Sequence, residues 1–151
     1  ISDTINKQLE AVSYDQFILS ELKNINLAEN NKFFLWHTWF SDVFNREDGK
    51  NGFDIVIGNP PYFLYQENHV GEIADLRKDK DYTIAFGGKL NAYKLFIANA
   101  LKKILSPKGV NCFIFQNSFL GDRQATNLRH YVLTNNKILK IDKLIEIQEK
   151  A

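Results

Sequence analysis

The 151-residue chain contains no methionine, one cysteine, and no apolar run close to the roughly 20 residues that a membrane-spanning helix needs. It also has no recognisable signal peptide, so we expect neither a membrane protein nor a secreted one. The single cysteine, Cys112, excludes an internal disulfide and suits a reducing cytoplasm. The net charge of +1 does not indicate nucleic-acid binding, although it leaves room for a local basic groove.

Two further absences concern completeness. The chain starts at Ile1, without an initiator methionine, in the middle of a helical pattern, and its eight glycines nowhere form Gly-x-Gly. We therefore expect a piece of a longer protein. Its length corresponds to one domain, and 44% hydrophobic with 25% charged residues is ordinary for a globular chain.

The first third is predicted to be helical and aromatic. Apolar residues at spacings of three and four predict an amphipathic helix over residues 4–27, with N-cap candidates at Ser2, Asp3 and Thr4. An aromatic stretch follows at residues 33–44 and contains Trp36 and Trp39, which we interpret as packing residues. We expect residues 1–48 to be a lead-in segment to a domain at residues 49–151.

The remainder predicts an α/β fold, because strands alternate with helices as they do around a parallel sheet. The expected elements in chain order are a strand at 53–58 buried on both faces, a helix from Leu90 that stops at residues 106–109, a strand at 110–115 that buries Cys112, a helix from Asp122 to about Leu133, and a strand at 138–147. Residues 64–88 are charged and lack firm periodicity, so we expect a long loop, a lid or a mobile segment.

Ligands of open parallel sheets bind beyond the carboxyl ends of the strands, where this chain has Asn59-Pro60-Pro61-Tyr62. Each proline lacks an N–H and keeps the preceding residue extended. The Asn59 side-chain oxygen and the Pro60 carbonyl thus become rigid acceptors with no backbone donor competing at either proline. Beside the Tyr62 ring, they suit a planar group that carries an amino group, such as adenine. The alternative reading is a strand that merely ends.

The sequence Phe-Asp-Ile-Val-Ile-Gly-Asn-Pro-Pro-Tyr at residues 53–62 resembles the catalytic motif of adenine-specific (N6) DNA methyltransferases of the TaqI-like and combined restriction–modification (type IIG) kind. The likeness covers roughly residues 33–147. Its other parts are the aromatic lead-in at 34–44, Asn91-Ala-Tyr93-Lys-Leu-Phe96-Ile with the exit at 105–109, Phe113-Ile-Phe-Gln-Asn117-Ser-Phe-Leu120, Leu128-Arg129, and the segment 141–147.

The resemblance implies the C-terminal half of a Rossmann-like catalytic domain that uses S-adenosylmethionine. Such enzymes flip the target adenine out of double-stranded DNA. Asn59 and Pro60 would accept the two amino hydrogens and so direct the amine at the donor methyl, while Tyr62 would stack on the base. Pro61 and Asn117 are further candidates for base contact. Asn59, together with Asn91 and Tyr93, would lie beside the cofactor.

The chain departs from the family pattern at three points. Gln116 replaces a usual proline, and Asn91 stands where an aspartate is also common. The glycine-rich cofactor turn is missing. We expect that turn before Ile1 and the target recognition domain after Ala151, with or without a fused nuclease. The fragment alone is therefore expected neither to bind the cofactor tightly nor to methylate DNA, and the parent to act in a bacterial or archaeal cytoplasm.

The remaining polar residues give weaker hypotheses. His37, His69 and His130 lack metal-ligand spacing, so no metal site is predicted. The charged run 77–81 is either a solvated loop or a lid that contacts phosphate, and Arg123 and Arg129 are equally ambiguous.

Two other functions stay open. The chain is alternatively part of a methyltransferase for another amide or amine, of protein glutamine or RNA, or a non-catalytic DNA-binding or assembly module with this fold.

Overall fold

The computed structural model describes residues 36–66 and 70–142, and internal contacts divide the chain into units of residues 1–51 and 52–151. The predicted helix over 4–27 lies outside the described residues. Within the first unit, two single-turn helices are described, α3 (Trp36–Trp39) and α4 (Ser41–Phe44). The Trp36 ring stacks on Phe40 at a centroid distance of 6.0 Å, as a packing residue would, whereas Trp39 is 45% exposed. The assignment of the two parts to a lead-in and a catalytic half-domain stays a prediction.

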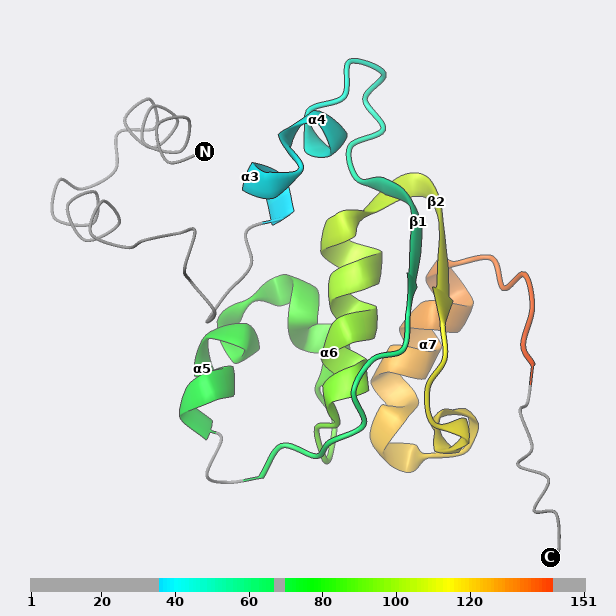
Figure 1. The fold of residues 1–151 in the computed structure, drawn as a ribbon. Helices are drawn as coiled ribbons and strands as arrows, with labels where there is room; N and C mark the ends of the chain where they lie inside the picture. The colour runs from blue at the N-terminus through cyan, green and yellow to red at the C-terminus, as the bar shows by residue number, and fades with distance from the viewer. Residues whose placement is uncertain (1–35, 67–69, 143–151) are drawn as a thin grey trace, which may run out of the picture. The chain divides into compact units, whose positions relative to one another are not determined.

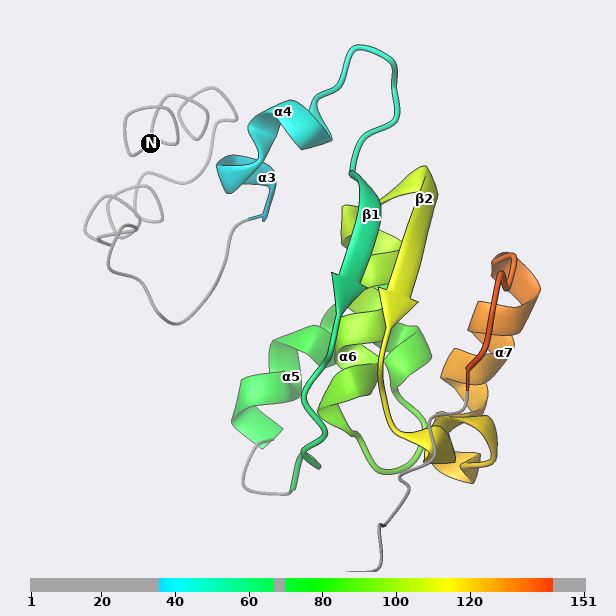
Figure 2. The same ribbon diagram turned by 45° about the vertical axis from the view of Figure 1, so that its right-hand side comes forward.

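The second unit is built on a parallel strand pair. Strands β1 (Phe53–Gly58) and β2 (Leu105–Phe113) are paired and point the same way, as Figure 2 shows. Helix α6 (Ala92–Asn99), continued by the π-helical turn η3 (Ala100–Ile104), lies between them in the chain, beside them in Figure 1 and behind them in Figure 2. This β-α-β crossover confirms the expected mixed α/β class with parallel strands.

Strand β2 begins earlier than predicted. The helical turn ends at Ile104 as expected, but residues 106–109 then form an irregular start of the strand rather than a loop. Phe53 pairs with Leu105, whereas Ile55 already pairs with Val110, so the extra residues of β2 bulge. Gly52 has φ 115°, and a Cβ there would lie 2.7 Å from the Ser106 nitrogen, so the close approach requires glycine.

One face of the strand pair forms the core. Helices α6 and α7 (Thr126–Asn135) bury their apolar residues against each other and against the end of β2. This cluster consists of Tyr93, Ile97, Phe119, Ala125 and Leu128, with Phe113 and Phe115 packed against it. A second cluster, led by Ile73, Leu90 and Leu95, joins α6 to the segment before it.

The opposite face of the strand pair is exposed, so the prediction of strands buried on both faces is wrong for the described chain. Ile55 and Ile57 are 68% and 75% exposed. Cys112, opposite Ile57, is exposed too, which corrects its prediction as a core residue. The physical reason is alternation: neighbouring side chains of a strand point to opposite faces, and the described helices cover one of them. We call the exposed residues Ile55, Ile57, Val110, Cys112 and Ile114 the open sheet face.

Residues 64–88 were predicted as a long loop, and this is wrong over most of their length. They contain helix α5 (Val70–Lys78) and the 3-10 helix η2 (Lys80–Ala85). Ile73 is 3% exposed, and Leu76 packs against the same cluster. These few apolar residues are enough to hold α5 on the core, although they are too sparse to produce clear periodicity.

After β2, the predicted helix is present as α7, but the predicted strand after it is not found among the described residues. After β2 come two 3-10 helices, η4 (Asn117–Leu120) and η5 (Arg123–Ala125). Asp122 caps η5 by accepting from the Gln124 N–H at 2.8 Å, and α7 follows. Of the predicted strand 138–147, residues 138–142 are irregular and exposed, with no strand partner among the described residues; the rest lies outside them.

Candidate active site

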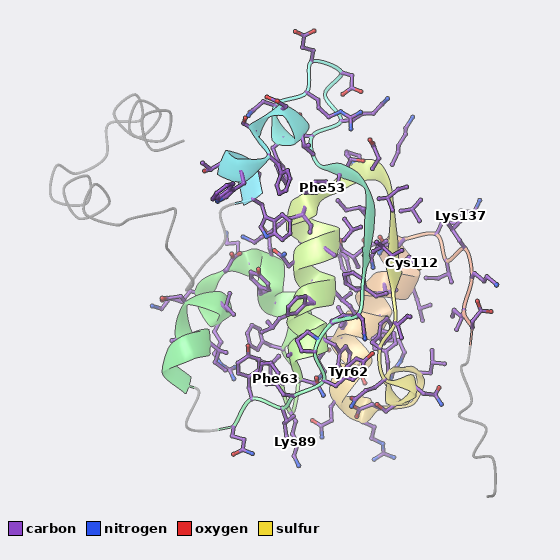
Figure 3. All side chains as sticks on the ribbon, viewed as in Figure 1. Phe53, Tyr62, Phe63, Lys89, Cys112 and Lys137 are labelled. Atoms are coloured by element: carbon purple, nitrogen blue, oxygen red, sulfur yellow. The ribbon has the colours of Figure 1, made fainter. Side chains whose placement is uncertain are left out.

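The motif Asn59-Pro60-Pro61-Tyr62 leaves the sheet at the carboxyl end of β1, and Ile114 to Asn117 leave it at the same end of β2. The N-terminus of α6 also lies at this end (Figure 1). Figure 3 shows Tyr62, Phe63 and Lys89 there, away from Phe53 at the other end of β1. The parallel pairing therefore brings together three segments that are distant in sequence.

Asn59 and Tyr62 are in direct contact. The Tyr62 hydroxyl lies 2.5 Å from Asn59 Oδ1 and donates to it. The same hydroxyl lies 2.9 Å from the Ile114 carbonyl oxygen, which ties the motif to the end of β2. Both side chains stay accessible, with Tyr62 41% exposed, whereas Pro60 is buried. The expectation of uncontested acceptors needs correction for Asn59, because a side-chain donor reaches its oxygen.

The chain after the motif is fixed to the start of α6. The Ala92 N–H donates to the Phe63 carbonyl and the Tyr65 N–H to the Leu90 carbonyl, each at 2.9 Å. Leu64 and Asn91 thus form an isolated antiparallel bridge. These main-chain bonds hold Asn91, the N-cap of α6, beside the motif.

Asn91 contacts the end of β2. Its Nδ2 donates to Gln116 Oε1 at 3.3 Å, while its Oδ1 is buried without a partner. A buried acceptor without a donor is unfavourable, so Asn91 Oδ1 suits a ligand that brings an N–H or O–H. Asn117, a candidate for base contact, is exposed at the start of η4, one residue beyond Gln116.

Tyr93 lies deeper than the other candidates. It is 1% exposed, stacked on Phe115 at a centroid distance of 5.7 Å and edge-on to Phe119. Its hydroxyl is buried without a partner. Burial raises the pKa of Tyr93, and the charge of Asp122 adds to this. Tyr93 is therefore a core residue, and its hydroxyl is a buried polar group without a partner.

Lys94 was not anticipated from the sequence. It is 1% exposed, and its ammonium donates to the carbonyls of Lys89, at 2.9 Å, and of Gln124. Burial lowers the pKa of Lys94, and the charge of Asp122 opposes this. Lys94 holds the loop before α6 against η5, and therefore shapes the rim of the site.

Arg129 has a similar structural role, which answers one of the two arginine ambiguities. Its guanidinium donates to the carbonyls of Phe119 and Asp122 at 2.7 and 2.9 Å. Arg123 is exposed on η5. In the charged run 77–81, Arg77 lies over the Phe86 ring at 4.7 Å and Asp79 caps η2, so this run is partly structural.

The described residues contain no group of three His, Cys, Asp or Glu side chains that could hold a metal ion. Among the same residues, no helix is long and apolar enough to cross a membrane.

Sequence reasoning placed Asn59, Tyr62 and Asn91 at one edge and missed two of their partners. Gln116 was noted only as a departure from a proline, although a long amide at a strand end is a signal for side-chain hydrogen bonding. The Ile114 carbonyl is a main-chain group and leaves no trace in the residue pattern.

Comparisons with known proteins identify the family of the chain. Residues 2–149 match the family described as Eco57I restriction-modification methylase. The type II methyltransferase M.AccI of Acinetobacter calcoaceticus is 28% identical over an alignment of 171 positions that includes 97% of this chain. The chain spans 30% of that relative's length. No solved structure matches.

Proposed function

The chain belongs to the Eco57I restriction-modification methylase family, and from this we propose that it is the base-binding half of the catalytic domain of a DNA methyltransferase that acts on adenine N6. The family implies a methyltransferase fold that uses S-adenosylmethionine. Residues outside this chain would complete a Rossmann-like domain with the glycine-rich cofactor turn and a target recognition domain. The observation that carries the proposal is the Asn59–Tyr62 pair, an acceptor and a flat ring in contact at the exposed end of β1.

The proposed chemistry must activate an aromatic amine. Such an amine is a poor nucleophile, because its lone pair is delocalised into the ring. Asn59 Oδ1 and the Pro60 carbonyl accept the two amino hydrogens and favour a pyramidal nitrogen. The ring of Pro60 fixes its φ and Pro61 keeps Pro60 extended, so the Pro60 carbonyl is held rigidly. This is catalysis by positioning and electrostatic preorganisation, and it needs no covalent enzyme intermediate.

The Tyr62 ring would form the wall on which the base lies. The target base must leave the duplex to be reached, and flipping is the general solution. Stacking on an aromatic side chain contributes about 1–3 kcal/mol per base in single-strand binders. Pro61 and Asn117, both exposed at this edge, are the further candidates for base contact.

The residues of the site also fit the cofactor. S-adenosylmethionine supplies a methyl group on a positively charged sulfur, and it carries hydroxyl and ammonium donors. Asn91 Oδ1 is a buried acceptor that lacks a donor, and the Tyr93 hydroxyl is likewise without a partner. Asn91 and Tyr93, together with Asn59, would hold the cofactor on the side of α6.

The open sheet face is where the remainder of the protein would pack. Four apolar or thiol side chains lie exposed on the two strands and a fifth, Ile114, just beyond β2, and the chain spans only 30% of its relative. Exposed apolar surface of this kind is expected to be covered by another segment. We assign the rest of the same polypeptide as that partner.

Double-stranded DNA would be the substrate. The test is to express the full-length protein, expose duplex DNA to it, and identify modified nucleosides in that DNA by mass spectrometry. We expect N6-methyladenine in DNA exposed to the native protein. Asn59→Ala is expected to lower the rate by about 10²–10³, the usual effect of removing one preorganised hydrogen-bond partner. Asn135→Ala, at the end of α7 and outside the site, is expected to have a much smaller effect.

The other outcomes are equally informative. Methylcytosine in place of N6-methyladenine would exclude the adenine assignment. Methyl transfer to protein glutamine or to RNA, but not to DNA, would favour the alternative methyltransferase. Unchanged adenine methylation by the Asn59→Ala protein would refute the assigned role of Asn59.

A further inference from the structure

The Tyr62 hydroxyl is shared between two acceptors. It lies 2.5 Å from Asn59 Oδ1 and 2.9 Å from the Ile114 carbonyl oxygen. A phenol carries one hydrogen, so it donates to one of these atoms at a time. The distance to Ile114 is ordinary for an O–H···O hydrogen bond and the distance to Asn59 is short, so either acceptor is within reach without movement of the ring.

The two acceptors differ in what else is required of them. Asn59 Oδ1 is the atom that the proposed mechanism needs for the substrate amine. The Ile114 carbonyl belongs to the main chain, and the Ile114 N–H donates to the Gly58 carbonyl at 3.1 Å, which fixes Ile114 at the end of the strand pair. Asn59 Oδ1 must therefore be free to accept from the substrate, and the Ile114 carbonyl is fixed in place beside it.

We propose that the Tyr62 hydroxyl is a positioning group that holds the Asn59 amide oxygen until the flipped adenine arrives and then turns its hydrogen to the Ile114 carbonyl. This rests on the proposed function. The movement is a rotation about the Cζ–Oη bond, so the ring keeps its place as a stacking wall. Asn59 Oδ1 has a donor in both states, the hydroxyl before base binding and the amine after it.

The consequence for catalysis is preorganisation. Without this hydrogen bond, an exposed asparagine at a strand end would sample several rotamers. Restricting it to one rotamer in the transition state would cost conformational entropy. The hydroxyl instead holds Asn59 Oδ1 in one position at the edge of the Tyr62 ring. Its hydrogen bond is not lost on substrate binding, because Ile114 takes it over.

The experiment uses the full-length protein on duplex DNA containing its target site, mapped first by sequencing of methylated DNA. Tyr62→Phe keeps the ring and removes the hydroxyl. We expect the single-turnover rate to fall about tenfold, the size of one neutral hydrogen bond, while the Kd for DNA changes less than about twofold. Tyr62→Ala removes the ring too, and both the rate and the affinity for DNA should fall.

Two further variants separate positioning from general disturbance. Tyr131→Phe, a hydroxyl deletion on α7 under Lys102, should behave as the native protein. The double variant Asn59→Ala/Tyr62→Phe should be no slower than Asn59→Ala, because Tyr62 acts through Asn59.

The outcomes are distinguishable from those of the proposed function. If the native protein methylates adenine and Tyr62→Phe is equally fast, the positioning role is refuted while the proposed function stands. Additive losses in the double variant would also refute it. If the native protein does not methylate adenine in DNA, the proposed function itself fails.

Discussion

Asp79 and Lys103 form an ion pair with 2.6 Å between Oδ2 and Nζ, which joins the start of η2 to the π-helical turn η3. Asp79 also accepts the Asp81 N–H at 2.9 Å through Oδ1, so a single carboxylate caps one helix and pairs with the other. Lys103 lies 5.4 Å above the Tyr82 ring. The segment between the motif and α6 is thus held to the core by charge as well as by apolar contacts.

Asp79 predicts a measurable loss of stability in acid. The Lys103 hydrogen bond, followed by that of the Asp81 N–H, lowers the pKa of Asp79 from its ordinary value of 3.8. A carboxylate with a lowered folded-state pKa stabilises the fold above its ordinary value, and this contribution is lost as pH falls through the folded-state value. The variant Asp79→Asn can still cap η2. We expect it to lower the free energy of unfolding at pH 7 by under about 1 kcal/mol, because both side chains of the pair are one third exposed. We also expect its stability to fall less steeply as the pH is lowered.

Thermal unfolding between pH 2 and 7 checks this. Asp79→Ala should cost about 1 kcal/mol more than Asp79→Asn, because it removes the cap as well. Asp75→Asn, in the exposed pair with Lys78, is the control and should change little. An acid decline of unchanged steepness in Asp79→Asn would show that Asp79 does not contribute to it.

Lys94 predicts a second rise of stability with pH, this one at alkaline pH. Burial lowers its pKa below the ordinary 10.5, so the unfolded chain binds the proton more readily. Stability should therefore rise as pH increases from the folded-state pKa towards 10.5, and Lys94→Met should abolish this rise. At pH 7 we expect Lys94→Met to cost about 1–3 kcal/mol, because the Lys89 and Gln124 carbonyls lose their donor.

Hydrogen exchange locates the effect. Faster exchange in Lys94→Met should be confined to the loop before α6 and to η5, which Lys94 holds together. Lys108→Met, an exposed lysine on the irregular part of β2, should leave exchange unchanged. Equal protection in both variants would refute the role of Lys94.

We expect the Lys89 side chain to contact a DNA phosphate. It is exposed and lies at the same end of the molecule as Tyr62 and Phe63, as Figure 3 shows. Lys89→Ala in the full-length protein should weaken DNA binding about equally for all sequences. The slope of log K against log salt should fall by about 1, the value for one phosphate contact.

Lys137→Ala is the matched control. Lys137 is equally exposed but lies after α7, away from Tyr62 in Figure 3. Salt titrations of DNA affinity for both variants decide the matter. A slope unchanged by Lys89→Ala, or changed as much by Lys137→Ala, would exclude the contact.

The fold was predictable where the pattern is dense. The apolar run at Phe53–Gly58 and the helical period from Leu90 identified β1 and α6, and their order implied a parallel crossover. Helix α5 was missed because it rests on few apolar residues, such as Ile73, among charged ones. The exposure of Ile57 could not be predicted, because an apolar run indicates that a strand is to be covered and does not say by which segment.

The site was predictable as far as topology fixes it. Neighbouring parallel strands have their carboxyl ends at the same edge of the sheet. Asn59 follows β1 and Asn117 follows β2, so both were expected at that edge. The Tyr62 contact with Ile114 spans 52 residues and involves a main-chain oxygen, to which side-chain identity gives no clue. Lys94 looked like any helix lysine, because burial of its ammonium depends on carbonyls of the loop before α6 and of η5.

The open sheet face has a practical consequence, because Cys112, the only cysteine of the chain, lies on it opposite Ile57. Its thiol is a built-in reporter of whether that face is covered. Alkylation by iodoacetamide, followed by mass spectrometry of the Cys112 peptide, should be fast in the chain produced alone and slow in the full-length protein. Equal rates in the two would mean that the face stays open to solvent in the full-length protein.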